Sequence, residues 1–316
     1  MKILVTGSIA YDTIMVFPDR FRNHLLADQL HILNVCFLTP EMRREYGGTA
    51  GNIAYNLNLL GERPLVMATV GEDIDPYLAR LRTLGLDIEL LQRIPGQFTA
   101  QGFITTDLDN NQITNFHPGA MNYSHENRIT PALGAGVAII GPDGKLGMQQ
   151  HARECAQHGI PFLFDPGQGL PMFSREELLE FLQLADYLAV NDYEGKLLEE
   201  KTGRSLEALA GDVKALVYTR GAEGSTILSG GQRHEVPCVE AQSVVDPTGC
   251  GDAYRAGLLY GIAHGWDWPT AGRLGSVMGA IKIAHRGGQN HAPAREEIEA
   301  RFERAFGYSP WKGMKQ

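Results

Sequence analysis

Short runs of β-branched and aliphatic residues, each bounded by Gly, Pro or Asp, constrain the fold of this chain more than any other feature. They are KILVTG, PLVMATVG, GVAIIGPD, PFLFDPG, YLAVND and ALVYTRG. Several alternate with segments of helical apolar spacing, which is typical of βαβ units and predicts an α/β fold with a mainly parallel sheet. Most runs end in a polar or glycine-rich turn. Because ligands of open α/β sheets bind at the carboxyl ends of the strands, these turns are the candidate site.

Two segments, residues 12–40 and 97–117, interrupt this pattern and are expected to form paired strands, the second with a turn at Asp109, Asn110 and Asn111. Both are too polar and too short to hold a core of their own. We therefore expect a small β-sheet lid, from about 12–45 and 97–120. Residues 251–307 are expected to be mostly helical. The chain, residues 1–316, is thus predicted to be one α/β domain with a lid subdomain.

Charge and cysteine usage exclude several classes of partner. The chain has 28 basic and 37 acidic residues and no long Lys/Arg run, which argues against a nucleic acid or a membrane surface as partner. A small anionic substrate is not excluded. No window of about 18 apolar residues predicts a membrane span. The four cysteines are far apart and form no C-x-x-C pair, which favours a reducing compartment, the cytoplasm.

The stretch DPTGCGDAYRAG, residues 246–257, combines a tight turn with the start of a helix. The glycines around Cys250 let consecutive backbone amides point at one place, and the positive end of the helix dipole favours an anion there. Asp252 would weaken such a phosphate site, unless it is a general base beside a hydroxyl that attacks the phosphoryl group. The alternative is that Asp252 only complements the helix dipole.

The sequence DPTGCGD resembles the D-T-x-G-A-G-D signature of the ribokinase-like (PfkB) carbohydrate kinases, and GGTAGNIAYNLNLLG, residues 47–61, resembles their N-terminal glycine-rich signature. The resemblance extends over the whole chain, in the expected order. It implies a doubly wound, mainly parallel sheet flanked by helices, with a β-sheet lid. It also implies ATP-dependent phosphorylation of a sugar or nucleoside hydroxyl. Cys250 stands where the family usually has alanine.

The resemblance assigns residues to the two halves of the reaction. Asp252 is expected to be the base, and the anion hole is expected from the backbone of Gly249, Cys250 and Gly251. The acceptor is expected to be bound by Asp12, Gly47, Gly48 and Asn52. The alternative for the second signature is a glycine-rich helix entry with Asn52 facing solvent.

Three further segments resemble the nucleotide side of the family. NDYE contains Asn191, expected at the nucleotide, and Glu194, expected to bind Mg²⁺ through water; an N-cap with Glu at N3 would look the same. TRGAEG supplies Thr219, Gly221 and Gly224 near the phosphates and ribose, or is an ordinary turn between strands. HRGGQN supplies Gly287 and Asn290 at the adenine pocket. A monovalent cation such as K⁺ near Asp246 is left open.

The acceptor remains the least constrained part of this hypothesis. The sequence at residues 47–61, 68–78 and 98–121 is most similar to bacterial adenosine and nucleoside kinases of this family, so adenosine is the favoured acceptor. Phe103, Phe116 and Phe37 would stack on a base, or pack the lid onto the body. Arginines at 20, 22, 43 and 44 would instead suit a sugar phosphate, or be solvated. Two alternative functions stay open: a sugar or sugar-phosphate kinase of the same family, and a non-catalytic sensor of nucleosides or sugars. The sequence also does not distinguish a monomer from a homodimer.

Overall fold

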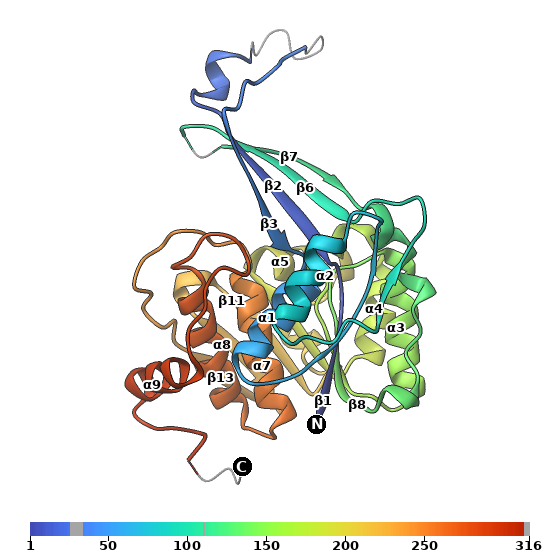
Figure 1. The fold of residues 1–316 in the computed structure, drawn as a ribbon. Coiled ribbons are helices and arrows are strands. Elements are labelled where there is room, and N and C mark those ends of the chain that lie inside the picture. Colours follow the sequence, from blue (N-terminus) through green and yellow to red (C-terminus); the bar gives the residue numbers. More distant parts are fainter. Residues whose placement is uncertain (26–33, 110, 313–316) are drawn as a thin grey trace.

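The computed structural model describes residues 1–25, 34–109 and 111–312. Figure 1 shows a body of helices around a large twisted sheet, with a smaller sheet rising from one end of the body. The predicted α/β class and the separate small sheet are both confirmed. The part of the predicted lid at residues 26–33, the turn residue Asn110 and the chain end at 313–316 lie outside the described residues.

The large sheet has, in the described part of the chain, nine strands in the order β13-β12-β11-β10-β9-β8-β1-β4-β5. The strands from β11 to β5 pair in parallel, and β12 and β13 are added antiparallel at one edge. Their bounds are β1 Lys2–Thr6, β4 Leu65–Val70, β5 Leu91–Arg93, β8 Ala135–Ile140, β9 Phe162–Phe164, β10 Tyr187–Asn191, β11 Ala215–Thr219, β12 Ser225–Ser229 and β13 Gln232–Val236.

Side chains that alternate along the central strands pack into two hydrophobic cores, one on each face of the sheet. Val5 of β1 lies in one core and its neighbour Leu4 in the other, and both are fully buried. Helices α1, α2, α7, α8 and α9 cover the first core, and α3, α4 and α5 cover the second. Because both faces are covered, the strands are continuous apolar runs, as parallel strands usually are.

The helices follow from the apolar spacing between the strands. The predicted helical segment at 251–307 contains α7, α8 and α9, which are separated by non-helical residues. The helix bounds are α1 Thr49–Leu59, α2 Asp75–Thr83, α3 Lys145–Gln157, α4 Arg175–Leu184, α5 Asp192–Thr202, α6 Leu206–Leu209, α7 Cys250–Ala263, α8 Trp268–Lys282 and α9 Arg295–Phe306. Short 3₁₀ segments are η1 Phe21–Asn23, η3 Gly119–Glu126, η4 Pro131–Leu133, η5 Gly167–Met172 and η6 Gly221–Glu223.

The small sheet has the order β3-β2-β6-β7, with β2 and β6 parallel and both outer pairs antiparallel. Its strands are β2 Ala10–Val16, β3 Glu41–Gly47, β6 Ala100–Thr106 and β7 Gln112–His117. The pairing predicted within 97–117 is confirmed. The second strand predicted within 12–40 is not found in the described part of that range, where residues 34–40 are not in a strand, and the partner of β2 begins at Glu41.

The misplaced strand has a physical explanation. β3 is an edge strand of a sheet that projects from the body, so most of its side chains are exposed or half-buried. Its sequence, EMRREYG, is accordingly charged and lacks an apolar run that would mark it as a strand. Separately, none of the helices in the described ranges combines the length and the apolarity that a membrane span needs.

Candidate functional site

The turn before α7 places unpartnered backbone amides at the start of that helix. Gly249 is the N-cap and has a φ of +78°, in the left-handed region that favours glycine. The amide of Cys250 donates to the carbonyl of Pro247 at 3.1 Å. Among the described residues, the amides of Gly249, Gly251 and Asp252 have no such partner. The amides of Gly249 and Gly251 are therefore free to donate to an anion, whereas the amide of Cys250 is used in the turn itself.

Asp252 lies in the first turn of α7, and its side chain is directed at α1. Its Oδ2 accepts a hydrogen bond of 2.8 Å from Nδ2 of Asn52. Burial raises the pKa of Asp252 from 3.8 to about 7; the hydrogen bond from Asn52 opposes this, and the negative charge of Asp165 adds to it. A carboxyl group with this pKa can accept a proton near neutral pH, as a general base must.

A buried ion pair between Asp165 and Arg255 lies beside Asp252, and neither residue was predicted from the sequence. Asp165 directly follows β9, and Arg255 is one turn after Asp252 on α7; Nε and Oδ2 are 3.1 Å apart. The side chain of Arg255 is 4% exposed and that of Asp165 is 7% exposed. The sequence signals were present: Asp165 ends a predicted strand, and Arg255 interrupts an apolar helix face. This pair holds the carboxyl end of β9 against the helix that carries the candidate base.

Asp12 lies on β2, where the small sheet leaves the body. Its carboxylate fits only because two neighbours lack side chains: a Cβ at Gly47 would lie 2.4 Å from Oδ2, and one at Gly102 2.9 Å from Oδ1. Burial raises the pKa of Asp12 to about 6, and the charges of Asp246 and Glu45 add to this. Its charge also contributes to the raised pKa of Asp252, so the two predicted carboxylates share one electrostatic environment.

The second glycine signature forms the entry to α1, and Asn52 faces the site rather than solvent. Gly48 is the N-cap of α1 with a φ of +82°, and a Cβ there would lie 2.5 Å from the carbonyl oxygen of Ser8. Asn52 is buried; its Oδ1 accepts from Nε2 of Gln289 at 3.1 Å while its Nδ2 donates to Asp252. The amide of Asn52 is thus fixed on both sides, and its donor is committed to the candidate base.

Residues after β10 and β11 lie on the predicted nucleotide side. Asn191 ends β10 next to Thr219, which ends β11, and the two are register partners. Asn191 and Glu194 form a capping box: each side chain accepts from the other's backbone amide at 2.8 Å. Gly221 and Gly224 lie in the η6 turn between β11 and β12. The two alternatives from the sequence are therefore both observed: Asn191 and Glu194 cap a helix, and residues 219–224 form a turn between strands. Neither arrangement excludes a nucleotide beside these residues.

Glu194 is suited to hold Mg²⁺ through water. It is 8% exposed, and burial together with the charge of Asp165 raises its pKa. Its Oε2 is used by the amide of Asn191, whereas Oε1 has no hydrogen-bond partner in the described part of the chain. A carboxylate oxygen left free among buried charges is the hard ligand that Mg²⁺ prefers. No cluster of three or more candidate metal ligands occurs in the described ranges.

The residues at Asp246 do not fit a monovalent cation. Oδ1 of Asp246 accepts from the amide of Thr248 at 2.9 Å and Oδ2 from that of Gly287 at 2.8 Å. Its carbonyl oxygen accepts from Nζ of Lys282 at 2.7 Å. Each oxygen of this residue thus already has a donor, and the nearest charge is itself positive. The predicted K⁺ site has no free ligands here.

The loop after α8 contacts both the site and the lid. Gly287, predicted at the adenine pocket, has a φ of +67° and donates to Asp246. Asn290 donates from Nδ2 to Oε2 of Glu45 on β3 at 2.7 Å. This side chain therefore links the loop to the base of the small sheet, and is not directed freely at a nucleotide.

The two phenylalanines predicted to stack on a base lie on opposite faces of the small sheet. Asp12 is opposite Gly102, and Gly102 is opposite Phe116, so these three share one face. Phe103 follows Gly102 and points to the other face. Both rings are exposed, at 53% for Phe116 and 37% for Phe103. Phe37 packs against Phe17, with ring centroids 4.8 Å apart, and belongs to an aromatic cluster in the lid.

The arginines considered for a sugar phosphate are paired within the lid. Arg20 and Arg22 both contact Asp109, at 2.8 and 3.6 Å. Arg43 contacts Glu45 at 3.3 Å, and Arg44 lies over the ring of Tyr11.

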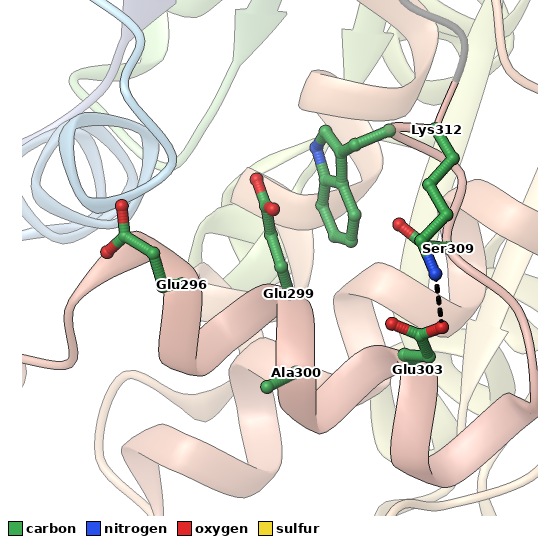
Figure 2. Close-up of a pocket in the computed structure, with 7 residues that line it drawn as sticks. Glu296, Glu299, Ala300, Glu303, Ser309 and Lys312 are labelled. Carbon is green, nitrogen blue, oxygen red and sulfur yellow. Dashed lines mark hydrogen bonds and ion pairs between the residues drawn. The ribbon is translucent and has the colours of Figure 1, made fainter.

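The surface recess in Figure 2 is separate from the candidate site. It lies between α9 and the C-terminal segment and is lined by glutamates and Trp311. It contains none of the predicted site residues.

Comparisons with known proteins show the family of this chain. A family model described as pfkB family carbohydrate kinase matches residues 9–295. The chain is 57% identical to a nucleoside kinase of Burkholderia thailandensis solved in complex with inosine, with a TM-score of 0.89 over 98% of this chain and 99% of that one. A complex of the same kinase with ADP-inosine matches at 58% identity and a TM-score of 0.87, over 98% and 97% of the chains. A nucleoside kinase of Methanocaldococcus jannaschii is 32% identical over 86% of this chain and 90% of its own length.

Proposed function

Because the chain belongs to the pfkB family of carbohydrate kinases, we propose that it is a nucleoside kinase that transfers the γ-phosphoryl group of ATP to the 5′-hydroxyl of a purine nucleoside, adenosine or inosine. The chain is an ATP-dependent phosphotransferase by its family. The preference for a purine nucleoside is supported by the Burkholderia kinase, which binds inosine and ADP at 57–58% identity to this chain. Adenosine is the acceptor that the sequence resemblance favours.

The observation that carries the proposal is the position of Asp252 among unpartnered amides at the start of α7, in one electrostatic environment with Asp12. In the proposed reaction Asp252 accepts the proton of the attacking hydroxyl. The amides of Gly249 and Gly251 donate to the phosphoryl oxygens, where negative charge develops in the transition state.

The acceptor would be held at the base of the lid. Asp12 would orient the ribose, and Asn52 would add the second hydrogen of its Nδ2, since the first is donated to Asp252. Gly47 leaves room for the carboxylate of Asp12, and Gly48 allows the close turn against Ser8 at the entry to α1. Phe116 shares the face of Asp12 and contacts the base. The small sheet acts as the lid that excludes water, which would otherwise hydrolyse ATP.

On the donor side, Asn191, Thr219, Gly221 and Gly224 would line the nucleotide, with Gly287 beside the adenine. Asn290, whose Nδ2 donates to Glu45, would help to close the adenine pocket by holding this loop against the small sheet. Glu194 would hold Mg²⁺ through water, as its free oxygen allows. When bound, Mg²⁺ neutralises charge on the phosphates. The cytoplasm is the proposed compartment, because the four cysteines are unpaired.

The test is a coupled ATP-to-ADP assay with Mg²⁺ and a panel of acceptors: adenosine, inosine, guanosine, cytidine, ribose, fructose and fructose 6-phosphate. We expect the highest kcat/KM with a purine nucleoside. A preference for a free or phosphorylated sugar would keep the family and refute the nucleoside assignment. No acceptor-dependent ADP formation with any compound would favour a sensor.

A further inference from the structure

Lys282 is a fully buried ammonium group that the mechanism above does not use. It is the last residue of α8 and is 0% exposed. Its Nζ donates to two backbone carbonyl oxygens, that of Asp246 at 2.7 Å and that of His285 at 3.0 Å. A buried ammonium is costly unless its charge is compensated. Here the two carbonyls, the negative end of the α8 dipole and the nearby carboxylate of Asp246 provide that compensation.

Lys282 joins the two segments that flank the phosphate turn. The segment before Gly249 is held to the end of α8, because the amides of Val245 and Asp246 donate to the carbonyl of Ile283 at 2.9 and 3.1 Å. The segment after α8 makes a second contact with it, because the backbone amide of Gly287 donates to Oδ2 of Asp246 at 2.8 Å. The ammonium of Lys282 lies between these two segments and donates to one carbonyl of each, those of Asp246 and His285.

A pair of buried carbonyl oxygens beside a carboxylate is otherwise a ligand set for a monovalent cation. With Nζ of Lys282 2.7 Å from one of these oxygens, a second cation would have to share it with a positive charge. At such short separations in a protein interior, repulsion between like charges is strong and opposes binding of a second cation. The site is therefore filled by the chain itself.

We propose that Lys282 is a positioning residue that takes the place of a bound monovalent cation beside the phosphate turn, so that phosphoryl transfer by this protein does not depend on K⁺. The inference rests on the phosphotransferase activity of the family, and not on which nucleoside is the acceptor. Lys282 fixes the turn that carries the amides of Gly249 and Gly251, and supplies a positive charge next to it.

The first experiment needs no variant. ADP affinity is measured by calorimetry, and turnover by the coupled assay, in potassium chloride and in tetramethylammonium chloride at equal ionic strength. Both quantities are expected to agree within about twofold between the two salts, the scale of a non-specific effect. A loss of about tenfold or more without K⁺ would overturn the proposal. Because ADP binding requires no acceptor, this result is readable even if the nucleoside assignment fails.

The second experiment uses two substitutions of matched charge and different volume. Lys282→Ala leaves space beside the carbonyls, whereas Lys282→Met fills it without a charge. In tetramethylammonium, both are expected to lose about tenfold or more in ADP affinity and turnover, the usual scale for hydrogen bonds to a charged group.

Adding K⁺ or NH₄⁺ is expected to restore Lys282→Ala and not Lys282→Met. Equal failure of both variants in all salts, with the fold intact by circular dichroism, would reduce Lys282 to a structural role and refute the proposal. If either variant does not fold, the salt comparison on the unaltered protein decides.

Discussion

Asp252 combines two properties that work against each other. Its carboxylate is the candidate base, and burial raises its pKa to about 7, so the ionised form that the reaction needs is also the form that destabilises the fold. Asn52 partly relieves this conflict by donating to Oδ2. The sequence motif identified Asp252, but its pKa depends chiefly on its burial, with smaller contributions from Asn52 and Asp165, and the motif does not reveal that burial.

The first prediction concerns the pH dependence of activity. Below pH 7 most of Asp252 is protonated, since its pKa is about 7, and a protonated carboxyl group cannot accept a proton. We expect kcat/KM for the acceptor to rise about tenfold per pH unit below pH 7 and to level off above it. A rate that is flat from pH 5.5 to 8, with chemistry shown to be rate-limiting, would contradict the assignment.

The second prediction concerns stability. The pKa of Asp252 is higher in the folded state, about 7, than the ordinary 3.8, so the cost of ionising it grows from pH 3.8 to pH 7 and is constant above. Asp252→Asn removes this cost. The variant should melt at a higher temperature than the unaltered protein at pH 8, by a margin that shrinks towards pH 5. A margin that does not change with pH would show that ionisation of Asp252 is not the cause.

At the residue scale, the sequence motifs indicated side chains that lie together in the structure, and they did not indicate contacts that join distant segments. Asp12, Asn52 and Asp252 come together as expected. Lys282 could not have been found, because a lysine at a helix end usually complements the dipole in solvent. Its burial depends on where residues 245–248 and 283–287 dock, which the local sequence does not reveal.

At the scale of elements, the two faces of the small sheet make a sharp test of the acceptor pocket. Phe116 shares the face of Asp12, and Phe103 lies on the other face of the same sheet. Phe116→Ala should raise KM for the nucleoside about three- to tenfold, as expected from loss of an aromatic contact. Phe103→Ala is the matched control and should leave KM nearly unchanged. The reverse pattern would place the base on the opposite face.

Predicting elements from sequence worked for the body and partly for the lid. Strands such as β8 and β10 are buried on both faces and are therefore recognisable as apolar runs. The edge strand β3 has no such constraint, since its side chains are mostly exposed or half-buried, and its position was misjudged. The face on which Phe103 points follows from strand register, which the sequence did not specify.

At the scale of the whole molecule, the buried pair of Asp165 and Arg255 connects the large sheet to α7. Arg255→Met would leave Asp165 charged and buried, and should lower the free energy of unfolding by about 3–5 kcal/mol. The control is the exposed pair of Arg153 and Glu180, where Arg153→Met should cost about 0–1 kcal/mol. Urea unfolding measures both. Equal effects would mean that the buried pair is not a structural connection.

The central claim, that Asp252 is the base of a nucleoside kinase, is tested most directly by single-turnover phosphoryl transfer from ATP to adenosine or inosine. Asp252→Asn should slow transfer by about 10²- to 10⁴-fold. Its nucleoside affinity should change by no more than about threefold, within the scatter of near-neutral substitutions. Asp75, also in a first helical turn, is the control for a dipole effect alone, and Asp75→Asn should retain the full rate. If Asp252→Asn transfers phosphate as fast as the unaltered protein, Asp252 is not the base.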